Sequence, residues 1–174
     1  MYKRQVLSIG YLTEGQASTC LLASDHLLAD DQLTIGACDN SMNYSKEKFM
    51  HSMNENDALI WTFRNNDAIL EDPKMYGWVE VDQFGMAKSV SCKVPISENP
   101  LNDHALVGAF SFKRADHFMN FAKKVISIDR RVNNEFYLDT VLDEYICSGY
   151  EVVPFEVNEY TCWGTPKDLE SHIP

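Results

Sequence analysis

The apolar residues in the first third of the chain form short runs separated by stretches of helical spacing. Runs at 6–9, 33–38 and 58–63 predict three buried strands. Along 16–28 apolar residues recur every three or four positions, which predicts a helix, and a second helix is predicted over 45–54 with its first serine as the N-cap. This β-α-β-α-β order favours a parallel sheet covered by helices.

The pattern changes after residue 75. Apolar runs at 76–81 and 86–92 flank a turn that contains glycine, so a hairpin is predicted there. The remaining predicted elements are a strand at 105–112, helices at 118–128 and 135–147, a strand at 151–157, and a helix that begins at Pro166 after Thr165 as its cap. Asp139 and Asp143 lie four residues apart on one predicted helix, a spacing typical of a solvated acidic edge. We therefore expect a single α/β domain over 1–174.

Charge and composition narrow the possible partners. The 174 residues include 15 lysines and arginines against 26 aspartates and glutamates, a formal net charge of −11. Such a field repels phosphate backbones, so no nucleic-acid partner is expected, although a local cation can still admit a small phosphorylated ligand. Five cysteines without a CxxC pair fit neither a zinc site nor a disulfide framework. No stretch approaches the roughly 20 apolar residues of a membrane span, so we expect a soluble, cytoplasmic protein without a membrane partner.

Asp39 is the first candidate for chemistry. It directly follows the predicted strand at 33–38, and ligands of α/β folds bind beyond the carboxyl ends of strands. A carboxylate there can hold a Mg²⁺ ion that bridges phosphates, although Asp39 can equally cap a turn. Gly15 opens the helix predicted over 16–28, whose free amides can meet an anionic ligand or simply begin a capped helix.

Two further segments place glycines or a cation beside predicted strands. Gly77 allows a ligand to approach the backbone closely, and Lys93 stands at the end of an apolar strand, where it can pair with a phosphate. The alternative is a solvated hairpin whose lysine extends into water. Trp163 and Gly164 connect a strand end to a helix. This connection can form the wall of a pocket, or it can be a plain turn.

Seven segments carry a family resemblance when they are taken in order. They are Thr13-Glu14-Gly15-Gln16-Ala17, Ala37-Cys38-Asp39-Asn40, the stretch from Pro73 to Asp82, Lys93-Val94-Pro95, Val107-Gly108-Ala109-Phe110-Ser111-Phe112, Asn134-Glu135-Phe136-Tyr137 and Trp163-Gly164-Thr165-Pro166. In this order they resemble the sugar nucleotidyltransferase family (the nucleotide-sugar pyrophosphorylases), from its base-contacting loop through its metal-aspartate loop and sugar-site hairpin to its closing motif.

The resemblance implies a Rossmann-like, GT-A-type α/β/α sandwich with a mixed, mostly parallel sheet. It implies transfer of a nucleotidyl group from a nucleoside triphosphate to a sugar 1-phosphate, with release of pyrophosphate, in nucleotide-sugar and polysaccharide biosynthesis. It makes Asp39 the ligand of a Mg²⁺ cofactor and Lys93 the cation that meets the sugar phosphate. The further substrate contacts that it implies are Glu14, Gly15, Gln16, Ala17, Gly77, Gly108, Glu135, Tyr137 and Trp163.

The sequence departs from the family pattern in two places. The chain has no G-x-G-x-R loop, which wraps the triphosphate in the family, and so resembles an N-terminally truncated, partial domain. Cys162 occupies the position of a second metal-binding aspartate, and a thiol is a poor ligand for Mg²⁺. Without the first strands of the family a sheet edge is exposed, so we expect a homo-oligomer that covers this edge.

Three explanations of the missing loop remain open: a fragment, a partner that supplies the loop, and a divergent relative without catalysis. The alternative functions are accordingly a non-catalytic module that binds a nucleotide-sugar with the same fold, and a GT-A glycosyltransferase. The glycosyltransferase requires an Asp-x-Asp motif, of which Asp39-Asn40-Ser41 contains only the first aspartate.

Overall fold

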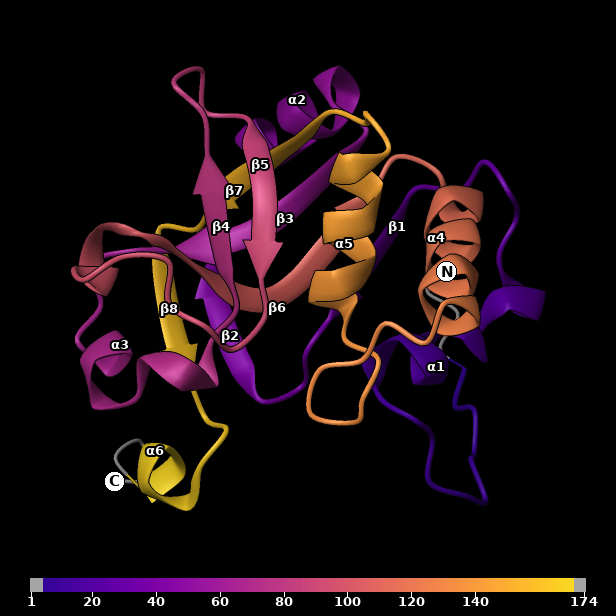
Figure 1. Ribbon diagram of the computed structural model, residues 1–174, viewed down its shortest axis with the longest axis horizontal. Helices are drawn as coiled ribbons and strands as arrows, with labels where there is room; N and C mark the ends of the chain where they lie inside the picture. Colours follow the sequence, from indigo (N-terminus) through magenta and orange to yellow (C-terminus); the bar gives the residue numbers. More distant parts are fainter. Residues whose placement is uncertain (1–4, 171–174) are drawn as a thin grey trace.

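The computed structural model describes residues 5–170, so residues 1–4 and 171–174 of the predicted domain lie outside the described part. Figure 1 shows a central sheet with helices packed against it. The strands are β1 Leu33–Gly36, β2 Asn40–Asn43, β3 Ala58–Phe63, β4 Trp78–Val81, β5 Ala87–Ser91, β6 His104–Phe112, β7 Val152–Glu156 and β8 Glu159–Cys162. The α-helices are α1 Gln16–Leu21, α2 Lys46–Glu55, α3 Ala68–Glu71, α4 Ala115–Ser127, α5 Leu138–Cys147 and α6 Pro166–Glu170, with 3-10 turns at η1 Ser24–His26, η2 Pro73–Met75 and η3 Pro100–Asn102.

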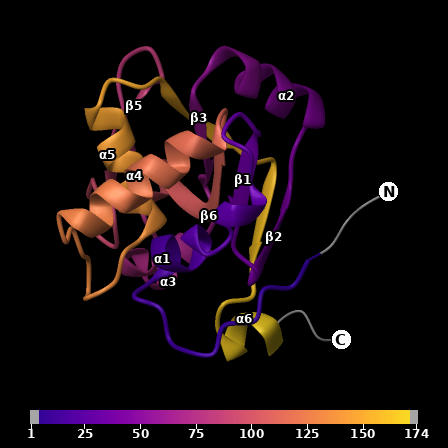
Figure 2. The ribbon, with the colours of Figure 1, turned by 90° about the vertical axis from the view of Figure 1, so that its right-hand side faces the viewer.

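The sheet separates two layers of helices. Figure 2 shows α4 and α5 on one side of β3 and β6, and α2 on the other. Strand β3 is buried along its whole length because both of its faces are covered. Ala58 and Ile60 pack in the cluster that contains α4 and α5, whereas Leu59 and Trp61 pack in the cluster that contains Met53 of α2. The predicted α/β/α sandwich is therefore confirmed.

The sheet is mixed, as predicted, but its pairing is mostly antiparallel. The strand order is β5-β4-β6-β3-β7, and β1 also pairs with β6. Strands β1 and β3 run in the same direction, but both are antiparallel to β6, which lies between them. Among the described pairings of this sheet only that of β3 with β7 is parallel. The difference arises because the chain reverses in the β4–β5 hairpin and returns as β6 between two strands that precede it.

The helix α2 is confirmed together with its predicted cap, whereas other elements differ from the prediction. Ser45 caps α2 by accepting a hydrogen bond from the backbone nitrogen of Lys48 at 3.2 Å. The strand predicted at 6–9 is absent from the described structure, and the side chain of Val6 is 90% exposed. The helix predicted over 16–28 ends at Leu21, and η1 follows. The small sheet of β2 and β8 was not predicted, because the polar sequence of β2 gives no apolar signal.

The prediction of a solvated acidic edge on α5 is wrong. Asp139 and Asp143 are only 7% and 8% exposed, because α5 packs against the β4–β5 hairpin. Asp143 accepts a hydrogen bond from the backbone nitrogen of Val90 at 2.9 Å and forms an ion pair with Arg130. It therefore ties the helix to β5, whereas Asp139 faces a cavity. No helix within residues 5–170 is long and apolar enough to cross a membrane.

Candidate functional site

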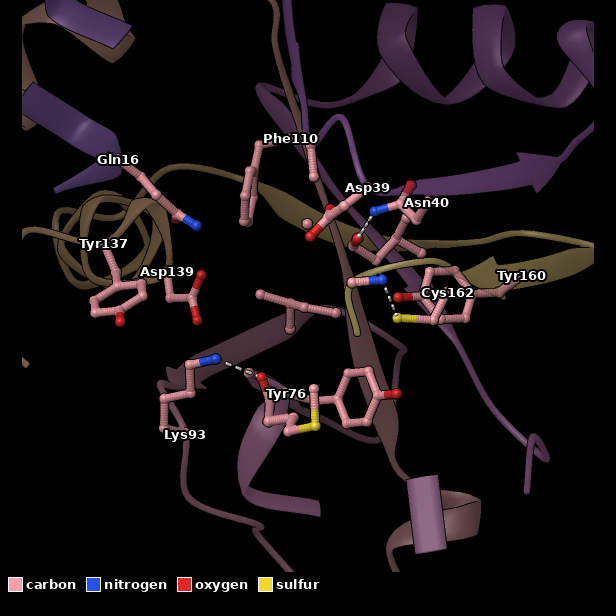
Figure 3. A pocket seen from close by; sticks show the side chains of 17 residues that line it. Gln16, Asp39, Asn40, Tyr76, Lys93, Phe110, Tyr137, Asp139, Tyr160 and Cys162 are labelled. Carbon is pink, nitrogen blue, oxygen red and sulfur yellow. Dashed lines mark hydrogen bonds between the residues drawn. The ribbon is translucent and has the colours of Figure 1, made fainter. Parts of the chain in front are cut away.

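A cavity of about 210 Å³ opens where β1, β6 and β8 meet the start of α5. Figure 3 shows Asp39 entering it from one wall, and Lys93 and Asp139 from the opposite wall. The predicted site residues that line this cavity are Gln16, Asp39, Gly77, Lys93, Gly108 and Tyr137. They come from sequence segments as far apart as α1 and α5, so the fold assembles these candidates in one place.

A second cavity of about 490 Å³ adjoins the first and shares Gln16, Ala37 and Gly108 with it. Two further predicted residues, Gly15 and Glu135, line this second cavity. The two cavities therefore meet at the end of β1, where Ala37 and Gly108 belong to both linings.

Three predicted contacts lie outside the linings of both cavities. Ala17 is fully buried, and its backbone nitrogen donates to the carbonyl of Phe136 at 2.9 Å. Glu14 forms an ion pair with Arg131 at 2.8 Å. The backbone nitrogen of Trp163 donates to the carbonyl of Asp39 at 2.8 Å, so Trp163 fixes the loop that carries this carboxylate.

Asp39 lies between β1 and β2, beside the end of β8. A Cβ atom at Gly164 would lie 3.2 Å from Oδ2 of Asp39 and 3.5 Å from Sγ of Cys162, so both side chains flank this glycine. The neighbouring Asn40 donates from Nδ2 to the carbonyl of Val107 at 2.9 Å, while its buried Oδ1 has no partner in the described structure. No group of three or more His, Cys, Asp or Glu within residues 5–170 could hold a metal ion. Asp39 is thus a single carboxylate, which suits an ion that takes its other ligands from water and phosphates.

Lys93 is held by an unusual backbone conformation. Its φ of 62° lies in the left-handed region, which non-glycine residues adopt rarely and often at functional sites. Its Nζ donates to the carbonyl of Met75 and lies 5.9 Å from the ring centroid of Tyr137. The ammonium group is therefore positioned at the cavity wall, with donor capacity left for a ligand.

Asp139 is a cavity residue that the sequence pattern did not identify. It lies in the first turn of α5, and a Cβ atom at Gly77 would come within 2.3 Å of its Oδ2, so any larger residue at position 77 would require this carboxylate to shift. Burial raises the pKa of Asp139 to about 6, against the opposing effects of a hydrogen bond with Cys92 and the charge of Lys93. The sequence offered one indication, since Asp139 follows the predicted contact Tyr137 by two residues. Helical spacing alone, however, does not distinguish a carboxylate in a cavity from a solvated one.

Gly108 shapes the junction of the two cavities. Its φ of 86° is in the left-handed region, and a Cβ atom there would lie 3.3 Å from the Cβ of Ala37. Its carbonyl accepts a hydrogen bond from the backbone nitrogen of Ala37 at 3.0 Å. Glycine therefore lets β6 and the end of β1 stay close while the space in front of them remains open.

Neither a protein-family model nor a curated protein matches this chain. Solved structures do resemble it. One is the nucleoside-diphosphate-sugar pyrophosphorylase from Vibrio cholerae RC9, with a TM-score of 0.74 and 15% identity over 94% of this chain and 66% of that one. Another is the inositol-1-phosphate CTP transferase from T. maritima, with a TM-score of 0.61 and 19% identity over 89% of this chain and 58% of that one.

HddC from Yersinia pseudotuberculosis, in complex with GMP-PN, matches with a TM-score of 0.59 and 14% identity over 91% of this chain and 60% of that one. The chain thus spans only 58% to 66% of the length of these three structures. At such identities the likeness concerns the fold. The chain has the α/β fold of these structures, which agrees with the fold that its sequence predicts.

Proposed function

We propose that the chain transfers a nucleotidyl group from a nucleoside triphosphate to a sugar 1-phosphate. The observation that carries this proposal is the pair of adjoining cavities, with Asp39 and Lys93 on opposite walls of the first. The acceptor would occupy the first cavity beside Gly77, and the nucleotide would extend past Gln16 into the second. Structures with this fold include a nucleoside-diphosphate-sugar pyrophosphorylase and a CTP transferase, which supports the choice of reaction.

In the proposed reaction an oxygen of the sugar phosphate attacks the α-phosphorus of the nucleotide in line. The bond between the α-phosphorus and the bridging oxygen breaks, and pyrophosphate leaves. Lys93 would hold the attacking phosphate and offset its charge, so that catalysis rests on positioning and electrostatics. Asp39 would hold a Mg²⁺ ion, which when bound supplies charge stabilisation at the phosphate oxygens.

The small number of cations at the two cavities favours a second candidate function. Lys93 is the only lysine or arginine among the described residues that line either cavity. A triphosphate and a sugar phosphate together carry far more negative charge than one lysine offsets. A module that binds a finished nucleotide-sugar, with its smaller phosphate charge, would need fewer cations and is the alternative that we retain.

Pyrophosphate release separates the two functions. The protein is mixed with Mg²⁺, one nucleoside triphosphate at a time and a pool of sugar 1-phosphates. Release above background that is reduced in Lys93→Met but kept in Lys88→Met supports the transferase, since Lys88 pairs with Glu80 outside both cavities. No release, together with calorimetric binding of a nucleotide-sugar that Lys93→Met abolishes, supports the binding module.

We also propose that a second copy of the chain covers the free edge of β1. Among the described strands β1 pairs with β6 alone, so its other edge has unpaired backbone groups. Residues 5–12 form no helix or strand and expose apolar side chains, including Leu12 at 96%. An exposed apolar segment and a free strand edge favour exchange between two copies. Light scattering after size exclusion tests this, and a monomer at micromolar concentration would contradict it.

The proposed reaction also favours the cytoplasm, in a pathway of polysaccharide biosynthesis. Nucleoside triphosphates are made there, and the five cysteines are free thiols in the structure, as a reducing compartment requires.

A further inference from the structure

The carboxylate of Asp139 lacks a compensating ion pair in the described structure. The described salt bridges include that of Asp143, on the same helix as Asp139, with Arg130 from the loop before this helix, but none involves Asp139. Its side chain is 7% exposed and lines the cavity, and the hydrogen bond with the Cys92 thiol is a weak one. A buried carboxylate in this state favours a donor or a cation supplied by a ligand.

Lys93 cannot provide that compensation once an acceptor is bound. The charge of its ammonium group lowers the pKa of Asp139, and the same ammonium group would hold the acceptor's phosphate. A phosphate monoester brings about two negative charges at neutral pH. The buried carboxylate would then face an anion at close range, which disfavours binding unless a further positive charge arrives with it.

The walls of the cavity suit a cation as well. Aromatic side chains line it from several elements: Tyr76, Phe110, Tyr137 and Tyr160. The faces of such rings attract ammonium groups, and the ring of Tyr137 already lies within 5.9 Å of the ammonium of Lys93. Figure 3 shows Tyr137 and Asp139 beside each other at this end of the cavity.

We propose that the acceptor carries an ammonium group close to its phosphate, and that Asp139 binds this group and determines acceptor specificity. The acceptor is then a zwitterionic phosphate monoester, such as an amino sugar 1-phosphate. Its phosphate meets Lys93, and its amine meets Asp139 next to the backbone of Gly77. This inference rests on the proposed function, because it names the acceptor class of the same site.

A matched pair of acceptors tests the proposal. Glucosamine 1-phosphate and glucose 1-phosphate differ only in an amine in place of a hydroxyl next to the phosphate-bearing carbon. We expect a KM about tenfold lower for the amine, the size of effect typical of a charge-assisted hydrogen bond. In Asp139→Asn the two KM values become equal. The control Asp25→Asn, an exposed position outside both cavities, keeps the wild-type preference.

The outcomes distinguish this inference from the proposed function. A wild-type enzyme that prefers glucose 1-phosphate, or a preference that persists in Asp139→Asn, overturns the inference and leaves the transferase standing. If no acceptor supports pyrophosphate release, the transferase fails, and calorimetry of both sugar phosphates with the wild-type protein decides the inference separately. Tighter binding of glucosamine 1-phosphate that Asp139→Asn abolishes supports it, and equal binding of the two refutes it.

Discussion

Replacing Asp139 by asparagine is expected to stabilise the protein at neutral pH. Burial raises the pKa of this carboxyl from 3.8 to about 6. A pKa difference of about two units between the folded and unfolded states corresponds to about 3 kcal/mol. Because the folded pKa is the higher one, the stability associated with the protonated carboxyl is fully present below pH 3.8 and is lost as the pH rises through about 6. At pH 7 the carboxylate is ionised and unfavourable, and an uncharged amide of the same shape removes this penalty.

Urea unfolding of the wild type and Asp139→Asn between pH 4 and pH 8 measures this difference. The free energies of unfolding should be similar near pH 4 and diverge with rising pH, until the variant is more stable by up to about 3 kcal/mol at pH 7. Asp25→Asn, at an exposed position outside both cavities, serves as the control. Parallel pH profiles for wild type and Asp139→Asn, or a variant that is less stable at pH 7, would refute the reasoning.

A carboxylate that destabilises the fold is informative about function. Residues of this kind are typical of sites where binding, not stability, determines the choice of side chain. If Asp139→Asn is both more stable and less selective for acceptors, the two experiments together assign Asp139 to the site.

Three further predictions concern the cavity walls. Gly77→Ala should lower the free energy of unfolding by about 1–3 kcal/mol, as measured in urea, because the added Cβ overlaps Oδ2 of Asp139. Lys93→Met should raise the KM for the sugar phosphate at least about tenfold in steady-state assays, with unchanged circular dichroism; an unchanged KM would remove Lys93 from the phosphate site. Asp39→Asn should abolish the Mg²⁺ dependence of nucleotide binding in calorimetry, whereas dependence that persists would place the ion elsewhere.

The sequence predicts the layers of the fold better than its strand pairing. An uninterrupted apolar run such as Ala58–Phe63 predicts a strand covered on both faces, and the structure confirms it. Strand direction depends on which strands become neighbours, and β6 pairs with β1 and β3 across large separations in sequence. The strand β2 is polar and pairs with β8 through its backbone, so no side-chain pattern predicts it.

The candidate site likewise contains residues that the sequence predicts and one residue that it does not. Asp39, Gly77, Lys93 and Gly108 belong to short motifs with recognisable residue types, and the cavity brings all of them together. Asp139 could not be found in this way, because Asp139 and Asp143 lie four residues apart on α5 and the helical pattern places both on one face. Only the packing of α5 against the hairpin shows that one carboxylate is tied to Val90 and the other faces the cavity.

The proposed nucleotide site, which has few cations, lies beside the free edge of β1. Ile35 and Gly36 of β1 line the second cavity, so a strand paired with the free edge would run beside the proposed nucleotide site. Cations from a second copy could then complement Lys93. If so, nucleotide affinity should rise with protein concentration over the range in which the dimer forms, measured by calorimetry and light scattering on the same samples. Affinity that is independent of concentration while the dimer forms would show that the edge and the site are unrelated.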